Sequence, residues 1–275
     1  MPYVNVEGAA LYYEEMGAGD PVVFVHGGWS NAATWGLTLP ELPASLRAIA
    51  YDRRGYSRSG PSTGRMPRRL HEDDLAALIE ALDVGPVHVV GNSYGASTAL
   101  GLAARRPELF QSVVAHEPPL MTIVADDPVA SAAMAETDVA LEAVLRRIEA
   151  GDPAGAAEQF VEEVALGPGM WALLPEPLRA IMIENAQAVL DDVRAPAWAD
   201  VDVERLAELE VPVLLTQGSE SPGWFLEIIR RLDEATPSAQ VVTIPGASHN
   251  PHGTHPADFA AVVAAHAETQ REAVR

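Results

Sequence analysis

The residues with the clearest chemical signature are at positions 91–95, which read Gly-Asn-Ser-Tyr-Gly. The apolar residues 87–90 before them predict a buried strand, and residues 96–105 after them have the pattern of a helix. A serine between two glycines at a strand–helix junction is typical of a nucleophile elbow, where the backbone passes close to its neighbours. The sequence therefore predicts that Ser93 is a nucleophile and that the N–H of Tyr94 helps to stabilise an oxyanion. An ordinary glycine-rich turn is the structural alternative.

With this segment, two others make the chain resemble the α/β-hydrolase family over nearly its whole length. Residues 23–28, Val-Phe-Val-His-Gly-Gly, are similar to the family's strand and His-Gly oxyanion loop. Residues 51–60 are similar to its Asp-x-Arg-Gly-x-Gly-x-Ser loop, with Ser57 where glycine is usual. The resemblance implies that the N–H of Gly28 is the second oxyanion donor and that His26 supports this loop. Ser57 falls in a structural loop, so we expect the chemistry to be unaffected.

The same resemblance selects a base among the eight histidines of the chain. His249 follows the last predicted strand and precedes the final predicted helix, where the order nucleophile, acid, histidine places the base. His252 and His255 continue a spacing of three, which suggests a metal site as an alternative. No carboxylate joins these histidines and prolines interrupt any helical face, so we expect no metal and structural roles for His252 and His255.

The acid that orients the base is where the sequence departs from the family pattern. The family usually supplies an Asp shortly after strand seven, but residues 217–222 read Gln-Gly-Ser-Glu-Ser-Pro, with Ser221 in that position and Glu220 beside it. Some members, including certain dehalogenases and lactone hydrolases, carry the acid at the end of strand six, where this chain has Glu117. An ionisable residue that ends a buried strand is unusual unless it is paired. We therefore favour Glu117 as the acid, with Glu220 as the alternative.

A mostly parallel sheet with helices on both faces is the architecture expected to position these residues. Strands alternating with helices along the chain indicate this α/β fold. Strands are expected at 21–25, 46–51, 87–90, 112–115, 211–216 and 240–244, after a hairpin at 3–6 and 10–15, and helices at 70–82, 96–105, 224–236 and 256–269.

The interval 120–210 breaks this alternation. It is rich in Ala, Glu and Leu, has helical periodicity near 139–148 and 178–193, and contains no clear strand. We expect a hydrolase core formed by residues 1–119 and 211–275, and a helical cap formed by residues 120–210. A chain of 275 residues is long enough for this organisation.

The composition of the chain disfavours several classes of binding partner and several kinds of site. The chain has 18 Lys and Arg against 39 Asp and Glu, a formal net charge of −21, which disfavours binding to nucleic acids and to anionic membranes. The absence of Cys excludes disulfides, thiolate nucleophiles and zinc–thiolate sites. No apolar run is long enough to span a bilayer and the first residues do not resemble a signal peptide, so we expect a cytoplasmic protein. The sequence does not indicate the oligomeric state.

A serine, a histidine and an acid imply acyl transfer to water through a covalent acyl-enzyme, without a cofactor. We expect a small hydrophobic ester or lactone as substrate, and residues 116–118 are similar to the same stretch of fungal lactone hydrolases. A non-hydrolytic ligand sensor and a cofactor-free haloperoxidase that works through a peracid are the alternatives. Dehalogenases and epoxide hydrolases are disfavoured, because an Asp would replace the serine nucleophile. The candidates for lining the pocket are Trp29, Trp171, Trp198 and Met170.

Overall fold

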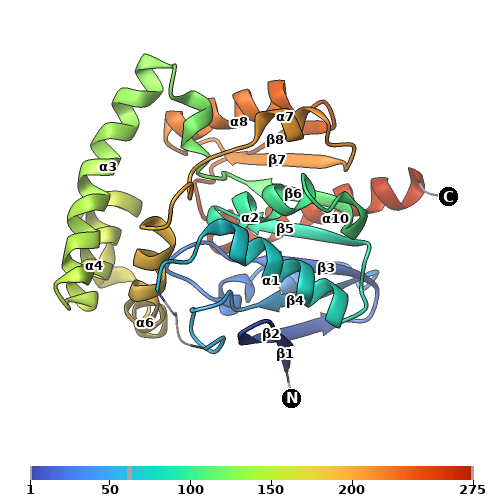
Figure 1. The fold of residues 1–275 in the computed structure, drawn as a ribbon, viewed down its shortest axis with the longest axis horizontal. Coiled ribbons are helices and arrows are strands. Elements are labelled where there is room, and N and C mark those ends of the chain that lie inside the picture. The colour runs from blue at the N-terminus through green and yellow to red at the C-terminus, as the bar shows by residue number, and fades with distance from the viewer. Residues whose placement is uncertain (1, 61–63, 274–275) are drawn as a thin grey trace.

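The computed structural model describes residues 2–60 and 64–273, and its centre is a sheet with helices on both faces (Figure 1). The strands are β1 Tyr3–Val6, β2 Ala9–Gly17, β3 Asp20–Val25, β4 Leu46–Tyr51, β5 Val87–Asn92, β6 Phe110–His116, β7 Val213–Gly218 and β8 Ala239–Ile244. Their order across the sheet is β1-β2-β4-β3-β5-β6-β7-β8. Neighbours from β4 to β8 in this order are parallel, and β1 and β2 are antiparallel additions at one edge.

The helices alternate with the strands along the chain, and a run of successive helices stands between β6 and β7 (Figure 1). The α-helices are α1 Arg68–Ala81, α2 Tyr94–Ala103, α3 Pro128–Glu149, α4 Pro153–Gln159, α5 Met170–Leu173, α6 Glu176–Val193, α7 Val203–Ala207, α8 Gly223–Ala235, α9 Pro251–Thr254 and α10 Pro256–Ala273. The shorter turns are the 3₁₀ segments η1 Ala32–Trp35, η2 Leu39–Glu41, η3 Pro107–Leu109 and η4 Met121–Val124, and the π-helical segment η5 Phe160–Ala165.

The sheet has apolar side chains on both faces, which explains why helices cover each face. In β3, Val23 and Val25 belong to the core beneath α1, α2 and α8, whereas Val22 and Phe24 belong to the core beneath α10. Successive side chains of a strand point to opposite faces, so the continuous apolar run of this strand contributes to both cores. The predicted α/β fold, with a mostly parallel sheet flanked by helices, is confirmed.

The predicted elements differ from the structure mainly at their ends. The helix expected at 96–105 already begins at Tyr94, directly after the turn that contains Ser93. The strand expected at 211–216 begins at Val213, because Pro212 has no N–H to donate to a neighbouring strand, and it continues to Gly218. Thr216 pairs with His116, the last residue of β6, so this extension carries Gly218 two residues beyond the end of β6.

Residues 120–210, called the cap here, contain α3 to α7 and no strand in this fully described part of the chain. The buried apolar side chains between Val144 and Leu190 form a cluster that Trp29, Tyr56 and Met66 from the rest of the chain complete. Trp29 follows β3 and Tyr56 follows β4, so the cap contacts the edge of the sheet where parallel strands end. In the described part of the chain, no helix has both the length and the hydrophobicity needed to cross a bilayer.

Candidate active site

Ser93 lies in a sharp turn between β5 and α2. Its φ is 54°, a left-handed conformation that a residue with a side chain rarely adopts. A Cβ on Gly95 would lie 2.1 Å from the carbonyl oxygen of Val25, and one on Gly91 would lie 2.5 Å from the backbone nitrogen of Ala96. Both distances are far shorter than van der Waals contact, so both flanking positions require glycine. The turn thus has the tight geometry that the sequence predicts for a nucleophile elbow.

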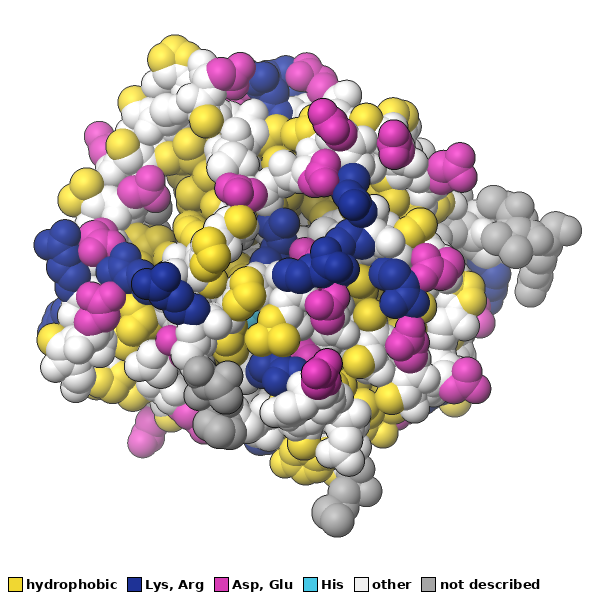
Figure 2. All heavy atoms as spheres, in the orientation of Figure 1, with side chains coloured by type: hydrophobic (Ala, Val, Ile, Leu, Met, Phe, Trp, Pro, Cys, Tyr) yellow, Lys and Arg dark blue, Asp and Glu magenta, His cyan; other side chains and the backbone are white. Residues whose placement is uncertain are grey.

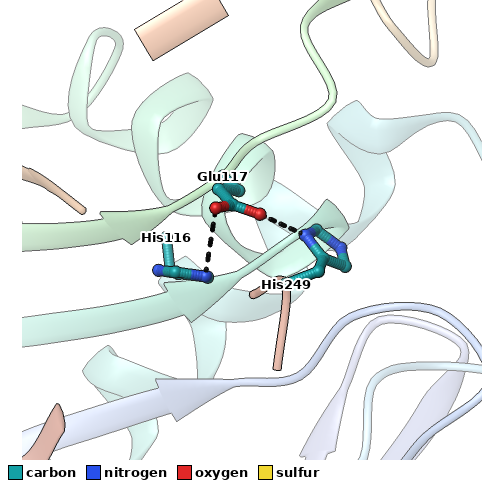
Figure 3. Close-up of side chains that lie close together, drawn as sticks. All are labelled: His116, Glu117 and His249. Carbon is teal, nitrogen blue, oxygen red and sulfur yellow. Dashed lines mark hydrogen bonds and ion pairs between the residues drawn. The ribbon is translucent and has the colours of Figure 1, made fainter. Parts of the chain in front are cut away.

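The acid–base pair of the site is formed by Glu117 and His249. Nδ1 of His249 lies 2.8 Å from Oε2 of Glu117 (Figure 3). Because an ionised carboxylate only accepts hydrogen bonds, Nδ1 of His249 carries the proton, and its Nε2 is left as an acceptor. The side chain of Glu117 is fully buried, whereas that of His249 is 28% exposed. His249 therefore donates an N–H to a buried charge, while its side chain stays partly open to solvent.

The loops that carry the serine and the histidine are joined by Asn92. This residue precedes Ser93, and its Nδ2 donates to the backbone oxygen of His249 over 2.9 Å. The aromatic ring of Phe225, in the first turn of α8, stacks on the imidazole of His249 with 4.5 Å between ring centroids. The sequence analysis did not assign Asn92 or Phe225 a role. Asn92 lies inside the predicted elbow, but Phe225 has no signal beyond its place in an amphipathic helix.

The carboxylate of Glu117 is held by donors from the loop after β7. Its Oε1 accepts hydrogen bonds from the backbone N–H of Gly218, at 2.8 Å, and from the hydroxyl of Ser221. Burial raises the pKa of Glu117, but the hydrogen bond from His249 and the interactions with His116, His249 and Ser221 together outweigh it, so the pKa of this carboxyl lies below its ordinary value. Glu117 is therefore ionised at neutral pH. Ser221, which stands where the family usually has Asp, donates a hydrogen bond that stabilises the carboxylate of Glu117.

Glu220, the alternative acid, has a different environment. Its side chain is exposed and accepts a hydrogen bond from the hydroxyl of Ser219 over 3.2 Å. The carboxylate that His249 contacts among the described residues is that of Glu117.

His116 lies beside this pair and is completely buried. Its Nδ1 is 3.0 Å from the hydroxyl of Thr216, and its Nε2 is 3.7 Å from Oε1 of Glu117 (Figure 3). Burial lowers the pKa of His116 to about 4, so this imidazole is neutral at pH 7 and does not compete with His249 for the charge of Glu117.

His116, Glu117 and His249 are also the residues whose potential metal-ligating atoms lie within 4.8 Å of one another in the described structure. The hydrogen bond between His249 and Glu117 already uses one atom from each, so the arrangement fits an acid–base pair. His252 and His255, the other histidines of the alternative metal site, are not part of this group and have other partners. Nε2 of His252 is 3.0 Å from the hydroxyl of Thr34, and Nδ1 of His255 is 2.9 Å from that of Thr254.

The loop with Gly28 packs directly against the nucleophile, since a Cβ on Gly27 would lie 3.0 Å from Cβ of Ser93. Nε2 of His26 accepts from the N–H of Arg53 at 2.9 Å, so its Nδ1 is the nitrogen that donates to the carbonyl oxygen of Gly27 at 2.7 Å. In a trans peptide the C=O and the N–H point in opposite directions, so this bond directs the N–H of Gly28 away from His26. Within the described residues, the N–H groups of Gly28 and Tyr94 have no acceptor. Both are available to an oxyanion.

The residues predicted to line a substrate pocket lie in different places. Trp29 is buried and stacks on Phe160 of η5 with 4.8 Å between centroids. Met170 and Trp171 are partly buried at the edge of the apolar cluster of the cap. Trp198 borders a cavity of about 330 Å³ between α3 and the segment that follows α6, where Figure 2 shows the surface hollowed beside α3. Ser93 and His249 are not in the lining of this cavity.

Comparisons with known proteins agree with this fold. A family model described as the alpha/beta hydrolase family matches residues 22–262. A 2-(acetamidomethylene)succinate hydrolase of Mesorhizobium japonicum is 30% identical over 253 residues, which cover 90% of this chain and 87% of that protein. A bifunctional esterase/perhydrolase of Acinetobacter calcoaceticus is 29% identical over 268 residues, covering 90% and 93% of the two chains. The crystal structure of an alpha/beta hydrolase from Sphaerobacter thermophilus matches with a TM-score of 0.77 and 26% identity, and covers 96% of this chain and 99% of that one.

Proposed function

Since this chain belongs to the α/β-hydrolase family, we propose that it is a serine hydrolase that cleaves a carboxylic ester or lactone through an acyl-enzyme. The observation that supports this most is the hydrogen bond between the buried Glu117 and Nδ1 of His249, which leaves Nε2 of His249 free to act as a base. The backbone of His249 is in turn bonded to Asn92, the residue before Ser93. A serine at such an elbow and an imidazole oriented by a carboxylate are the parts that acyl transfer requires.

The proposed reaction has two halves. In the first, Oγ of Ser93 attacks the carbonyl carbon and passes its proton to Nε2 of His249, and the resulting oxyanion accepts from the N–H groups of Gly28 and Tyr94. Collapse of this tetrahedral adduct breaks the ester bond, and His249 returns the proton to the leaving alcohol. In the second half, His249 deprotonates a water molecule that attacks the acyl group and releases the acid. Glu117 stabilises the imidazolium in both halves.

An apolar substrate fits the surroundings of the proposed oxyanion hole. A Cβ on Gly28 would lie 3.7 Å from Cγ2 of Val189, so the cap helix α6 brings an apolar side chain next to this loop. Trp29, the next residue, is covered by Phe160 of the cap. We propose on these contacts that the cap roofs the site and excludes water from the reacting groups.

A second reaction uses the same machinery. The relative from Acinetobacter calcoaceticus is named an esterase/perhydrolase, which supports perhydrolysis as a second candidate. Hydrogen peroxide would then replace water in the second half, attack the acyl group on Ser93 and leave as a peracid, which oxidises a halide. No cofactor is needed for either reaction.

Steady-state hydrolysis of p-nitrophenyl butyrate, followed by a panel of aliphatic lactones, tests the proposal. We expect turnover by the wild type and a loss of at least about 10³-fold in Ser93→Ala, because the remaining groups have no nucleophile to assist. Equal turnover by Ser93→Ala would refute the mechanism. A folded wild type that binds these compounds without turning them over would support a ligand sensor instead.

A further inference from the structure

A buried ion pair joins the end of the cap helix α6 to the loop after β4. Arg53 is fully buried, and its two terminal nitrogens each donate to Oδ2 of Asp192 over 3.0 Å. The hydroxyl of Tyr56 donates to the same oxygen over 2.6 Å, and Nε2 of His71 lies 2.7 Å from Oδ1. Asp192 is only 2% exposed, so one carboxylate on the cap is surrounded by donors from the rest of the chain.

The other contacts of Arg53 are to the backbone of the oxyanion loop. Its Nε donates to the carbonyl oxygen of His26 over 3.1 Å, and one terminal nitrogen donates to that of Gly27 over 3.2 Å. The guanidinium also lies over the ring of Tyr94, with its Cζ 4.7 Å from the centroid. One side chain thus contacts the peptide that carries the N–H of Gly28 and the residue that carries the other donor.

The position of this guanidinium depends on the charge of Asp192. Burial raises the pKa of Asp192, but Arg53 and His71 outweigh it, so the pKa of this carboxyl lies below its ordinary value and the pair is ionised at neutral pH. A buried cation that loses its partner carries an uncompensated charge, which drives it toward water and away from its other contacts. The carbonyl oxygen of Gly27 would then lose one of its two side-chain donors.

We propose that Asp192 is a positioning residue, which holds Arg53 against the oxyanion loop so that the hole is complete only when the cap helix α6 is docked. The inference rests on the proposed function, because it concerns the same pair of N–H donors. On this proposal the cap helps to stabilise the transition state through the oxyanion hole, in addition to covering the site.

The chain offers a matched control in the next residue. Arg54 forms a bidentate pair with Asp74, with Nε donating over 2.8 Å and a terminal nitrogen over 2.6 Å. Both side chains are less than a tenth exposed. The remaining contact of Arg54 is to the carbonyl oxygen of Glu7, far along the chain from the oxyanion loop. Asp74→Asn therefore removes the same charge from a buried Arg–Asp pair without reaching the site.

The test compares Asp192→Asn with Asp74→Asn in two measurements. One is kcat and KM for p-nitrophenyl butyrate, and the other is the Ki of an alkyl trifluoromethyl ketone, whose adduct with Ser93 is an oxyanion. A lost oxyanion-hole donor costs about 10²–10³ in kcat. For Asp192→Asn we expect kcat to fall by about 10²-fold and Ki to rise by a similar factor, with KM changed less than about threefold. Asp74→Asn should change each quantity less than about threefold.

Tyr56→Phe keeps the test decisive if Asp192→Asn does not fold, since it removes one hydrogen bond to Asp192 and leaves the ion pair. It should lower kcat and raise Ki about fivefold, with KM unchanged. The inference is wrong if the wild type is active and kcat and Ki of Asp192→Asn and Tyr56→Phe differ from the wild-type values no more than those of Asp74→Asn do. It is also wrong if only KM changes in these two variants. A wild type that neither turns over the ester nor binds the ketone would instead refute the proposed function, and this inference with it.

Discussion

We propose that the acid of this site, Glu117, comes from the end of β6, and the geometry of two neighbouring strands supports this position. β6 and β7 are paired in parallel, so the residues that follow them lie at the same edge of the sheet. The N–H of Glu117 donates to the carbonyl oxygen of Thr216 over 3.2 Å, which places the two strand ends side by side. A carboxylate from β6 reaches the histidine of the β8 loop, and Ser221 from the β7 loop adds a hydrogen bond to it.

The role of Glu117 can be separated from that of Glu220 by removing each charge in turn. Glu117→Gln keeps the size of the side chain but cannot stabilise the imidazolium of His249, so we expect kcat for p-nitrophenyl butyrate to fall by about 10³–10⁴-fold. Glu220→Gln alters an exposed side chain that contacts Ser219, and should leave kcat within about twofold of the wild type. Loss of turnover in Glu220→Gln alone would show that the acid is assigned to the wrong residue.

At the level of elements, we propose that the packing of α8 against the β8 loop helps to orient His249, the proposed base. Phe225 stacks on His249 and is itself covered by Trp224, whose ring centroid lies 3.8 Å away. Stacking on a flat ring restricts the orientation of the imidazole, and a branched aliphatic side chain would restrict it less.

Phe225→Leu is therefore expected to lower kcat about tenfold while leaving the fold intact, since the apolar volume is largely kept. The free energy of unfolding, measured with urea, should fall by about 1 kcal/mol. Phe110→Leu, in the buried strand β6 of the same core, is the control and should lose similar stability without a change in kcat. An unchanged kcat in Phe225→Leu would mean that Glu117 alone orients the base.

The elements were largely predictable from the sequence, and so were the residues of the elbow. Apolar runs of strand length indicate strands that are buried on both faces. The Gly-x-Ser-x-Gly pattern indicates a tight turn, and a Cβ at Gly91 or Gly95 would indeed clash with the backbone. The contacts of Asp192 and Phe225 were not predictable. Both lie on helices of ordinary pattern, and periodicity shows which face of a helix is buried but not what covers it. The bond between Ser221 and Glu117 also depends on pairing between β6 and β7, which are separated along the chain by the cap.

At the scale of the whole molecule, buried neutral histidines link stability to pH. Burial lowers the pKa of His88 and of His116 to about 4, and that of His252 to about 3. In the unfolded chain a histidine has a pKa of about 6.5. Between these values the unfolded state binds more protons than the folded state, so this contribution to stability is complete above about pH 6.5 and is lost as the pH falls.

We expect the free energy of unfolding, measured with urea, to decrease by several kcal/mol between pH 7 and pH 5. His88 lies in β5, and its Nδ1 is 2.8 Å from the hydroxyl of Ser112 in the neighbouring strand β6. His88→Gln should therefore reduce the number of protons taken up on unfolding in this pH range by about one, which makes the decrease less steep. A free energy of unfolding that stays constant from pH 7 to pH 5 would contradict the assignment of these histidines as buried and neutral.

The most direct test of the central claim, that His249 and Glu117 activate Ser93, is the intact mass of the protein after treatment with a fluorophosphonate. This probe transfers its phosphonyl group to an activated serine, and the adduct occupies the oxyanion hole. We expect one adduct per chain in the wild type, none in Ser93→Ala, and labelling slowed by at least about 10²-fold in Glu117→Gln. A folded wild type that remains unlabelled, or labelling that persists in Ser93→Ala, would contradict it.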